Sequence, residues 1–482
     1  MKKSLWLLVA LLVVGPSKVD AYEAAQTHAG MSEAAAGELV PWLQGAWGFD
    51  KGLWTKLRLS VKSISRNQRW FLLQDLFRLD PAGGYAPSAD LTDRALGWFV
   101  AGSVLEAMPS ARVRNHFLDP STLKGLHQRR GHRRLSLKLR WWDYIFGGGS
   151  FAGFVTGANF DLDGKSALAW LRSSRNEYGL SKHWRYRRLA VTAPSPQARA
   201  HAEAMALLTM GAVVHVLQDM ACPSHVHNDF IASHLGRAMG AQPGSAYERF
   251  VARRYGRYGV AVLSVSAVTR RRFRDFFVAK DGKGLAQITA RRFLSPGVLP
   301  PPLYVGDTSS ISSVERMLKK RGFTMTHRPL ELARARRGPV YLWRRRQARA
   351  RLAAYEVDRR GFLRFWLDRR VLGDYALRLV PLAIAYTKGM IRYLTRGRLA
   401  LKVDRGRVSV INTGVTLGRG RLVILAEDRQ ARRTVLKRVD VTHLVRKGGR
   451  LATFSLGRPR FLAVMFEGKD VEGEYLVAEG RR

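Results

Sequence analysis

The sequence predicts a mainly α-helical protein that ends in a β-sandwich-like domain. Up to about residue 394, apolar residues recur at spacings of three and four, and Gly or Pro clusters separate the segments, which is the pattern of packed helices. After Thr395 the pattern changes to seven short β-rich runs separated by turn residues, as in a sandwich. We therefore expect a helical domain over residues 22–396 and a β-sandwich-like domain over residues 397–482.

A secretory signal peptide is expected at residues 1–21. Its basic start is followed by an apolar run over residues 5–14 and by small residues that end at Ala21, which is the pattern of a cleaved leader. The apolar run is too short to span a bilayer comfortably. No later segment has an uncharged run of the needed length, so we expect no integral membrane segment in the mature chain. The mature protein is predicted to begin at Tyr22 and to be secreted or periplasmic.

The chain is strongly basic and contains a single cysteine. Its 82 Lys and Arg residues against 37 Asp and Glu residues give a formal net charge of +45. Such a field attracts anionic partners, which include phospholipid head groups at a peripheral membrane contact and nucleic acid. Cys222 alone cannot form an intramolecular disulfide, so the core must be stable without one. A small buried packing residue is the favoured interpretation of Cys222, and metal ligation is the alternative.

The helical part contains five clear candidate helices. Their apolar spacing places them at residues 91–107, 166–175, 197–219, 246–255 and 375–394. Residues 147–149, 296–302 and 322–339 are expected to be loops because of their Gly and Pro content. The segment 371–394 has an apolar face that should pack on the helix ending at Asp219, and Pro381 should kink it. The later β-rich runs are 399–403, 407–415, 421–428, 433–441, 451–456, 461–468 and 473–480.

The most informative stretch is HVLQDMACPSHVHN, residues 215–228. The helix before it is apolar on every side, which indicates that it is buried. His215 and Asp219 are four residues apart, so they lie on one helical face. Pro223 should end the helix and place His225 on the exiting loop. Burial of a neutral polar group without a partner costs roughly 2–7 kcal/mol, and of a charge more, so a shared cation would remove a large penalty.

A core histidine bonded to Asp219 is the alternative to a metal site. Three further histidines, His225, His227 and His234, crowd the next turn and loop. Because imidazole together with carboxylate is a ligand set that suits zinc, the crowding favours a metal cluster over a single satisfied histidine.

Two other segments offer residues that could complete the site. His28 follows the expected cleavage point closely, in what reads as the start of a helix, and the α-amine freed at Tyr22 could ligate the same metal. A solvated surface histidine is the alternative for His28. His116 lies in the turn NHFLDP, and Glu106 precedes it at the end of an apolar helix. By themselves these two residues indicate only a helix end and a loop.

The chain resembles the zinc-dependent phospholipase C family, which shares its helical fold with the single-strand-specific zinc nucleases. Four motifs carry the resemblance, and together they span residues 22 to about 248. They are the H-x3-D-x3-P-x-H pattern from His215 to His225, the NHFLDP turn around His116, the early Thr27–His28 pair, and Glu248 in GSAYERF. Their order along the chain makes a chance match improbable.

The resemblance implies a site that holds up to three zinc ions. His116, His215 and Asp219 would hold the first ion. Asp219 would bridge to a second ion, bound by His28 and the mature amino terminus at Tyr22. In such a multi-metal site the metals lower the pKa of a bound water, neutralise the phosphate oxygens and steady the leaving oxygen.

The third zinc ion would be held by His225 and Glu248 with one more histidine. Relatives often place that histidine four residues before the acidic ligand, and this position is Gly244 here. His234 is the best substitute and His227 the second. We therefore expect His225, His234 and Glu248 to form the third site.

The acidic residue that helps to activate water is usually an aspartate in the family. This chain has Glu106 followed by Ala107 where an acidic pair would be expected. The resemblance therefore implies Glu106 as the catalytic base.

These observations predict a secreted, zinc-dependent phosphodiester hydrolase of phospholipase C type. Metal-activated water would attack the phosphorus of a phospholipid and release a diacylglycerol and a phosphorylated head group. One alternative is a zinc nuclease acting on single-stranded nucleic acid, with Trp141, Trp142 and Tyr144 as base-stacking candidates or as plain core residues. Another is a non-catalytic protein that keeps a degenerate zinc site for stability and binds anionic envelope surfaces, which Gly244 and Ala107 support.

Overall fold

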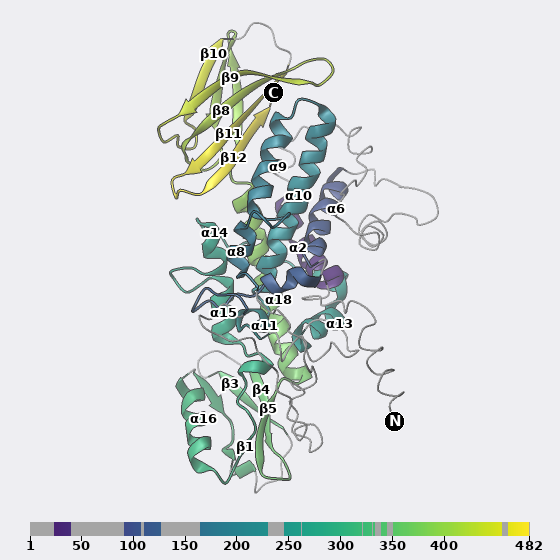
Figure 1. Ribbon diagram of the computed structural model, residues 1–482, viewed down its shortest axis with the longest axis vertical. Helices are drawn as coiled ribbons and strands as arrows, with labels where there is room; N and C mark the ends of the chain where they lie inside the picture. Colours follow the sequence, from purple (N-terminus) through teal and green to yellow (C-terminus); the bar gives the residue numbers. More distant parts are fainter. Residues whose placement is uncertain are drawn as a thin grey trace, which may run out of the picture.

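The fold is described from a computed structural model of the full chain. The described residues are 24–39, 91–107, 110–126, 164–229, 245–261, 263–320, 322–329, 331–332, 339–344, 350–455 and 461–481. The predictions that concern the signal peptide, Tyr22, His234 and Gly244 lie outside these ranges, as do those for Trp141, Trp142 and Tyr144. Figure 1 shows an elongated molecule with helices in the middle, a β-sandwich at one end and a smaller sheet at the other.

The central helix is α10, Pro196–Asp219, which is buried on all sides from Ala202 onwards. It begins at Ser195, whose side chain accepts a hydrogen bond from the backbone N–H of Ala198, and Pro196 occupies the first turn, where no N–H partner is needed. Helices α6, α9 and α18 pack around it. Among the described residues, α10 is the one helix long and apolar enough to cross a membrane, and 94% of its most apolar window is buried inside the protein.

The surrounding helices place the other polar residues of interest. The five predicted helices are all present; four of their ends coincide with the prediction, and the others differ by one to six residues. The larger helices around α10 are α2 (Ala29–Ala35), α6 (Leu91–Leu105), α9 (Leu180–Thr192), α13 (Ala246–Ala261) and α18 (Arg369–Leu394). The shorter ones are η1 (Ala24–His28), η2 (Ala36–Glu38), η4 (Ser110–Asn115), α8 (Ala167–Arg172), α11 (Pro223–Val226), α14 (Phe273–Phe277), α15 (Leu285–Arg292), η6 (Pro296–Val298) and α16 (Thr308–Lys320).

Helix α18 packs on α10, as its apolar face predicted. It begins at Asp368, whose carboxylate accepts a hydrogen bond from the N–H of Val371, and it continues as one helix with Pro381 inside it. The apolar side of α18 thus closes the core around the last turns of α10, where His215 and Asp219 lie.

The expectation of a mainly helical chain up to residue 394 is wrong for residues 303–366. This region forms a five-stranded antiparallel sheet in the order β1-β5-β4-β3-β2. Its strands are only two to seven residues long, and periodicity cannot identify such short runs. Packing of α18 on β4 and of α16 on β1 and β2 supports the sheet. The strands are β1 (Leu303–Tyr304), β2 (Phe323–Met325), β3 (Val340–Arg344), β4 (Arg351–Val357) and β5 (Phe362–Trp366).

Each of the seven β-rich runs after Thr395 contains a strand. The strands form a three-stranded sheet, β10-β7-β6, and a four-stranded sheet, β12-β11-β8-β9. The two sheets share one apolar core, so the predicted β-sandwich architecture is present. The strands are β6 (Leu399–Asp404), β7 (Arg407–Asn412), β8 (Leu417–Glu427), β9 (Arg433–Val441), β10 (Arg450–Ser455), β11 (Phe461–Asp470) and β12 (Tyr475–Arg481).

The four-stranded sheet is apolar on both faces. In β8, Leu422 and Ile424 point into the sandwich core, whereas Val423 and Leu425 belong to the core of the helical part, because successive residues of a strand face opposite sides. Helix α9 packs against β11 and β12. The sandwich is therefore continuous with the helical core, and a division into two domains near residue 397 stays a prediction.

Candidate metal centre

The site begins where α10 ends. The helix stops at Asp219, and Met220 forms its carboxyl-terminal cap. The prediction that Pro223 ends this helix and leaves His225 on a loop is wrong, since Pro223 begins the short helix α11, which contains His225. Cys222 has extended backbone angles (φ −94°, ψ 120°), as the residue before a proline should. The chain therefore turns between Asp219 and Pro223, and His225 returns towards the helix end.

The structure brings His28, His215 and Asp219 together in a fully buried group. One ligand atom of each lies within 4.8 Å of the others. The Nε2 atom of His28 is 3.2 Å from Oδ1 of Asp219, and Nε2 of His215 is 3.3 Å from Oδ2. The two imidazole rings stack with their centroids 3.7 Å apart. Two ring nitrogens from distant segments thus converge on the two oxygens of one carboxylate.

The opposite ring nitrogen of each histidine is held by an oxygen. Nδ1 of His215 donates to the backbone carbonyl of Ser103. Nδ1 of His28 is 2.7 Å from the amide oxygen of Gln218, whose amide nitrogen donates to the hydroxyls of Ser32 and Thr387. Because these oxygens accept, Nδ1 carries the proton and the Nε2 lone pair faces Asp219. Metal-binding histidines are oriented by this kind of outer hydrogen bond.

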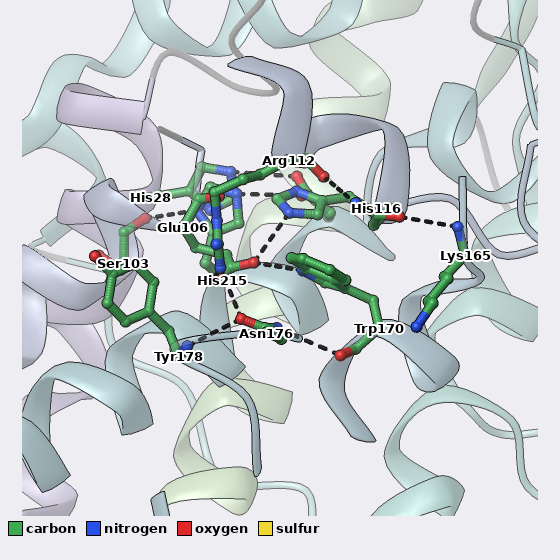
Figure 2. Close-up of polar contacts among 12 residues, drawn as sticks. His28, Ser103, Glu106, Arg112, His116, Lys165, Trp170, Asn176, Tyr178 and His215 are labelled. Atoms are coloured by element: carbon green, nitrogen blue, oxygen red, sulfur yellow. Dashed lines mark hydrogen bonds and ion pairs between the residues drawn. The ribbon is translucent and has the colours of Figure 1, made fainter. Parts of the chain in front are cut away.

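His116 lies beside this group, between two carboxylates. It follows the 3-10 turn η4, and its Nδ1 is 2.8 Å from Oδ2 of Asp219, while its Nε2 is 3.4 Å from Oε1 of Glu106. Its ring meets that of His215 edge to face at 5.0 Å. Burial would lower the pKa of His116, but its bonds to Asp219 and Glu106 raise the pKa overall. Figure 2 shows His28, Glu106, His116 and His215 converging from separate segments of the chain.

Glu106, the predicted base, is fully buried and has a donor on each oxygen. Arg112 donates to Oε2 at 2.6 Å, and the indole N–H of Trp170 donates to Oε1 at 2.7 Å. Arg112 also donates to the amide oxygen of Asn176 at 2.7 Å and lies over the rings of Trp170 and Tyr178. Burial would raise the pKa of Glu106, but the charges of Arg112 and His116 lower it overall. The sequence analysis missed these partners, which lie in segments that carry no motif.

A second group contains Cys222, His225 and Glu248. All three are buried, and one ligand atom of each lies within 4.8 Å of the others. Nε2 of His225 is 3.2 Å from Oε1 of Glu248, and its Nδ1 donates to the carbonyl of His116 at 3.2 Å. The other carboxylate oxygen of Glu248 accepts from the backbone N–H of Ser245. The predicted pair His225 and Glu248 thus meets, and the cysteine joins it.

The two candidate replacements for the missing histidine have different positions. Nε2 of His227 lies 3.1 Å from the carbonyl oxygen of Ala290, and His227 is not in either candidate metal group of the described residues. His234, the preferred replacement, lies outside those residues, as does the predicted amino-terminal ligand Tyr22.

Burial and neighbouring charge set the protonation of the first group. Burial would raise the pKa of Asp219, but the charges of His225, His215 and His28 hold it well below its usual value. Burial and the nearby His28 lower the pKa of His215 to about 4. The pKa of His225 is raised to about 9, because Asp219 and Glu248 outweigh its burial. The cluster therefore pairs an ionised carboxylate with a neutral His215, which is the protonation that metal ligands require.

Three buried polar atoms in and beside the first group lack a hydrogen bond of normal geometry. They are Nε2 of His116, Nε2 of His215 and Oδ1 of Asp219, whose ion-pair contacts with Glu106, Asp219 and His28 are 3.2–3.4 Å long. Each unsatisfied buried polar atom costs about 1–3 kcal/mol. A divalent cation held by these atoms would remove the cost, and imidazole and carboxylate donors suit zinc. The residues present therefore fit the metal that the resemblance implies.

Comparison with known proteins found structural likenesses but no sequence match. No protein-family model matches this sequence, and no curated protein matches it. The chain is similar to a solved structure of alpha toxin from Clostridium absonum (TM-score 0.28, 10% identity, covering 96% of this chain and 99% of that one). It is also similar to Clostridium perfringens alpha-toxin from an avian strain (TM-score 0.27, 10% identity, 96% and 99% coverage). At this TM-score and identity, the likeness assigns no activity to this chain, and what the site can do is inferred from its own residues.

Proposed function

We propose that the protein is a secreted, zinc-dependent phosphodiester hydrolase of phospholipase C type. The observation that carries the proposal is the convergence of His28 and His215 on Asp219, fully buried and with ligand atoms within 4.8 Å of one another. A second buried group with His225 and Glu248 lies directly beside it, joined through the backbone of His116. Adjacent groups of this composition are what hydrolysis of a phosphodiester at several metals requires.

Bound zinc would supply charge neutralisation for the phosphate oxygens and activation of water. The protein's own contribution is to hold the ligands rigidly and to exclude bulk water, since their side chains are buried. Gln218 and the carbonyl of Ser103 orient His28 and His215 before a metal arrives. Such preorganisation keeps Nε2 directed at the metal rather than at a competing hydrogen bond.

Glu106 is the proposed proton acceptor. Its Oε1 atom lies 3.4 Å from Nε2 of His116 and accepts a hydrogen bond from the indole of Trp170. Its Oε2 atom is neutralised by Arg112 at 2.6 Å. The carboxyl is thus held ionised, and Oε1 is the oxygen that would take a proton on the side facing the metal ligands. To act as a base, Glu106 must retain its ion pair with Arg112. Its Oε1 atom must also accept a hydrogen bond from the reacting water in place of the one from Trp170.

A phospholipid is the proposed substrate. The net charge of +45 attracts anionic phosphodiesters and the surfaces that carry them. Hydrolysis on the diacylglycerol side of the phosphorus would leave the lipid product in the membrane and release a phosphorylated head group.

The test compares two histidine variants of the same helix. His215→Ala removes a proposed ligand, whereas His201→Ala changes an exposed histidine of α10 and serves as the control. Purified mature protein with zinc is assayed for head-group release from phosphatidylcholine vesicles and for cleavage of single-stranded DNA. We expect lipid hydrolysis by the wild type and by His201→Ala, and none by His215→Ala. Cleavage of DNA without hydrolysis of lipid would show that the substrate is nucleic acid and not phospholipid. No hydrolysis of either substrate would contradict the proposal and favour a zinc-stabilised binding protein.

A further inference from the structure

Cys222 lies in the apolar core next to two other buried residues that can bind a metal. Its thiol lies within 4.8 Å of ligand atoms of His225 and Glu248, and its side chain is fully buried. Its Sγ atom also lies 3.7 Å from the hydroxyl of Ser245. Cys222 belongs to the apolar core, but its thiol also has an imidazole and a carboxylate within reach. The surroundings are those of a ligand.

The backbone fixes the thiol and the imidazole on one side of a turn. Cys222 is the cap of α11, and the N–H of His225 donates to its carbonyl at 3.1 Å. The pattern Cys-x-x-His within one turn brings Sγ and the ring together without help from distant segments. Glu248 then enters from the first turn of α13, with Oε2 held by the backbone N–H of Ser245 and Oε1 facing Nε2 of His225 at 3.2 Å.

The orientation of the other two residues suits coordination. Because the carbonyl of His116 accepts from Nδ1 of His225, Nε2 is the ring nitrogen directed towards Glu248 and the cysteine, and it would release its proton when a metal binds. Zinc–sulfur and zinc–nitrogen bonds of about 2.3 and 2.0 Å put tetrahedral ligand atoms roughly 3.3–3.6 Å apart. Separations of up to 4.8 Å therefore need only a small contraction of the three side chains.

Charge also favours the cysteine. A thiolate and a carboxylate together carry two negative charges, which one Zn²⁺ ion neutralises, while the imidazole stays neutral. Buried charge is tolerated when it is paired or bound to a metal. Thiolate is a softer ligand than the oxygen donors preferred by magnesium and calcium, so it biases the site towards zinc.

We propose that Cys222 is a metal ligand and completes a second zinc site with His225 and Glu248. It takes the place of the histidine that the position of Gly244 lacks. The inference rests on the proposed function, because it assigns a ligand within the same cluster. It differs in one respect, since it predicts a sulfur–metal bond whether or not the protein turns over a substrate.

Cobalt spectroscopy tests the inference without any activity assay. Metal-free full-length mature protein is titrated with Co²⁺ under anaerobic conditions, and its absorption spectrum is recorded. Thiolate bound to cobalt gives an intense near-ultraviolet charge-transfer band, which imidazole and carboxylate ligands do not give. Because Cys222 is the only cysteine in the chain, any such band reports this residue. We expect the band in the wild type, where its intensity should stop rising once the site that contains Cys222 is filled. We expect no such band in Cys222→Ser.

Two further variants keep the result interpretable. Elemental analysis should find about one zinc ion fewer per chain in Cys222→Ala, and Cys222→His should recover the zinc without recovering the cobalt band. Cobalt bound without a thiolate band would overturn the inference and leave the proposed function intact. Failure of the wild type to bind cobalt or zinc at all would overturn both. The wild-type spectrum needs no variant, so poor folding of a variant cannot hide the answer.

Discussion

The backbone carbonyl of Ser103 accepts the Nδ1 proton of His215, although the two residues are 112 positions apart. The contact exists because α6 and α10 cross at very short range. A Cβ atom built on Gly102 would lie 1.8 Å from the carbonyl oxygen of Leu208, and one on Gly211 would lie 1.9 Å from that of Phe99. Two glycines in helix interiors, each costing about 0.5–1 kcal/mol relative to alanine, thus allow the approach that orients a proposed metal ligand.

We predict that Gly211→Ala weakens both the fold and the metal site. The added methyl group must push the backbones of α6 and α10 apart, and overpacking of this kind costs about 1–3 kcal/mol or more. The separation also removes the carbonyl of Ser103 from His215. Urea unfolding and zinc content measure the two effects. Gly37→Ala is the control, because a Cβ there meets nothing within 4 Å; equal behaviour of the two variants would refute the packing argument.

Removal of Arg112 alone should destabilise the protein more than removal of both Arg112 and its partner Glu106. Arg112→Met leaves the buried carboxylate of Glu106 without its cation, at a cost of about 3–5 kcal/mol. In the double variant Arg112→Met, Glu106→Gln, no buried charge remains unpaired. We expect the double variant to be more stable than Arg112→Met alone, as measured by a double-mutant cycle in urea. Strict additivity of the two single changes would show that the ion pair is not coupled.

Zinc should stabilise the native state through the proposed ligands. A ligand that binds only the folded chain adds about 2.7 kcal/mol at a hundredfold excess over its Kd. Thermal unfolding with zinc and with a chelator should therefore differ by several degrees in the wild type and in His201→Ala. The difference should shrink sharply in a variant with both His215→Ala and Asp219→Ala. An unchanged zinc response in that double variant would place the metal elsewhere.

Glu203 should make stability depend on pH near neutrality. Burial raises the pKa of this carboxyl to about 7, although Arg481, whose Nη2 is 3.3 Å away, opposes the shift. The folded state then binds the proton more tightly than the unfolded chain. The contribution of Glu203 to stability is therefore fully present below about pH 4.5, and it is lost as the pH rises towards 7. The loss is on the order of 3 kcal/mol.

The variant Glu203→Gln isolates this contribution. It cannot ionise, so the free energy of unfolding should decline less between pH 5 and about pH 7 than in the wild type. Urea unfolding at several pH values measures the difference between the two proteins, which cancels groups that titrate in both. Parallel pH profiles would mean that Arg481 keeps Glu203 ionised throughout.

Local spacing in the sequence was enough to predict several elements. His215 and Asp219 share a helical face because helices repeat every 3.6 residues, and the apolar surroundings of that helix predicted its burial. The seven strands after Thr395 could be predicted because turn residues bound each run, and each run is long enough to show a β-rich or alternating pattern of apolar and polar residues. In both cases the pattern that identifies the element lies within a short stretch of chain, although the strands are held together by pairing with distant ones.

Tertiary structure alone decided the rest. The five-stranded sheet over residues 303–366 depends on pairing between short, distant strands and on α18 packing against it. Glu106 meets Trp170 across 64 residues, and His28 meets Gln218 across 190. The sequence favoured a packing role for Cys222, and only the structure brings Glu248 within reach of its thiol. A residue's spacing determines which face it lies on, but its chemistry depends on what the rest of the chain packs against that face.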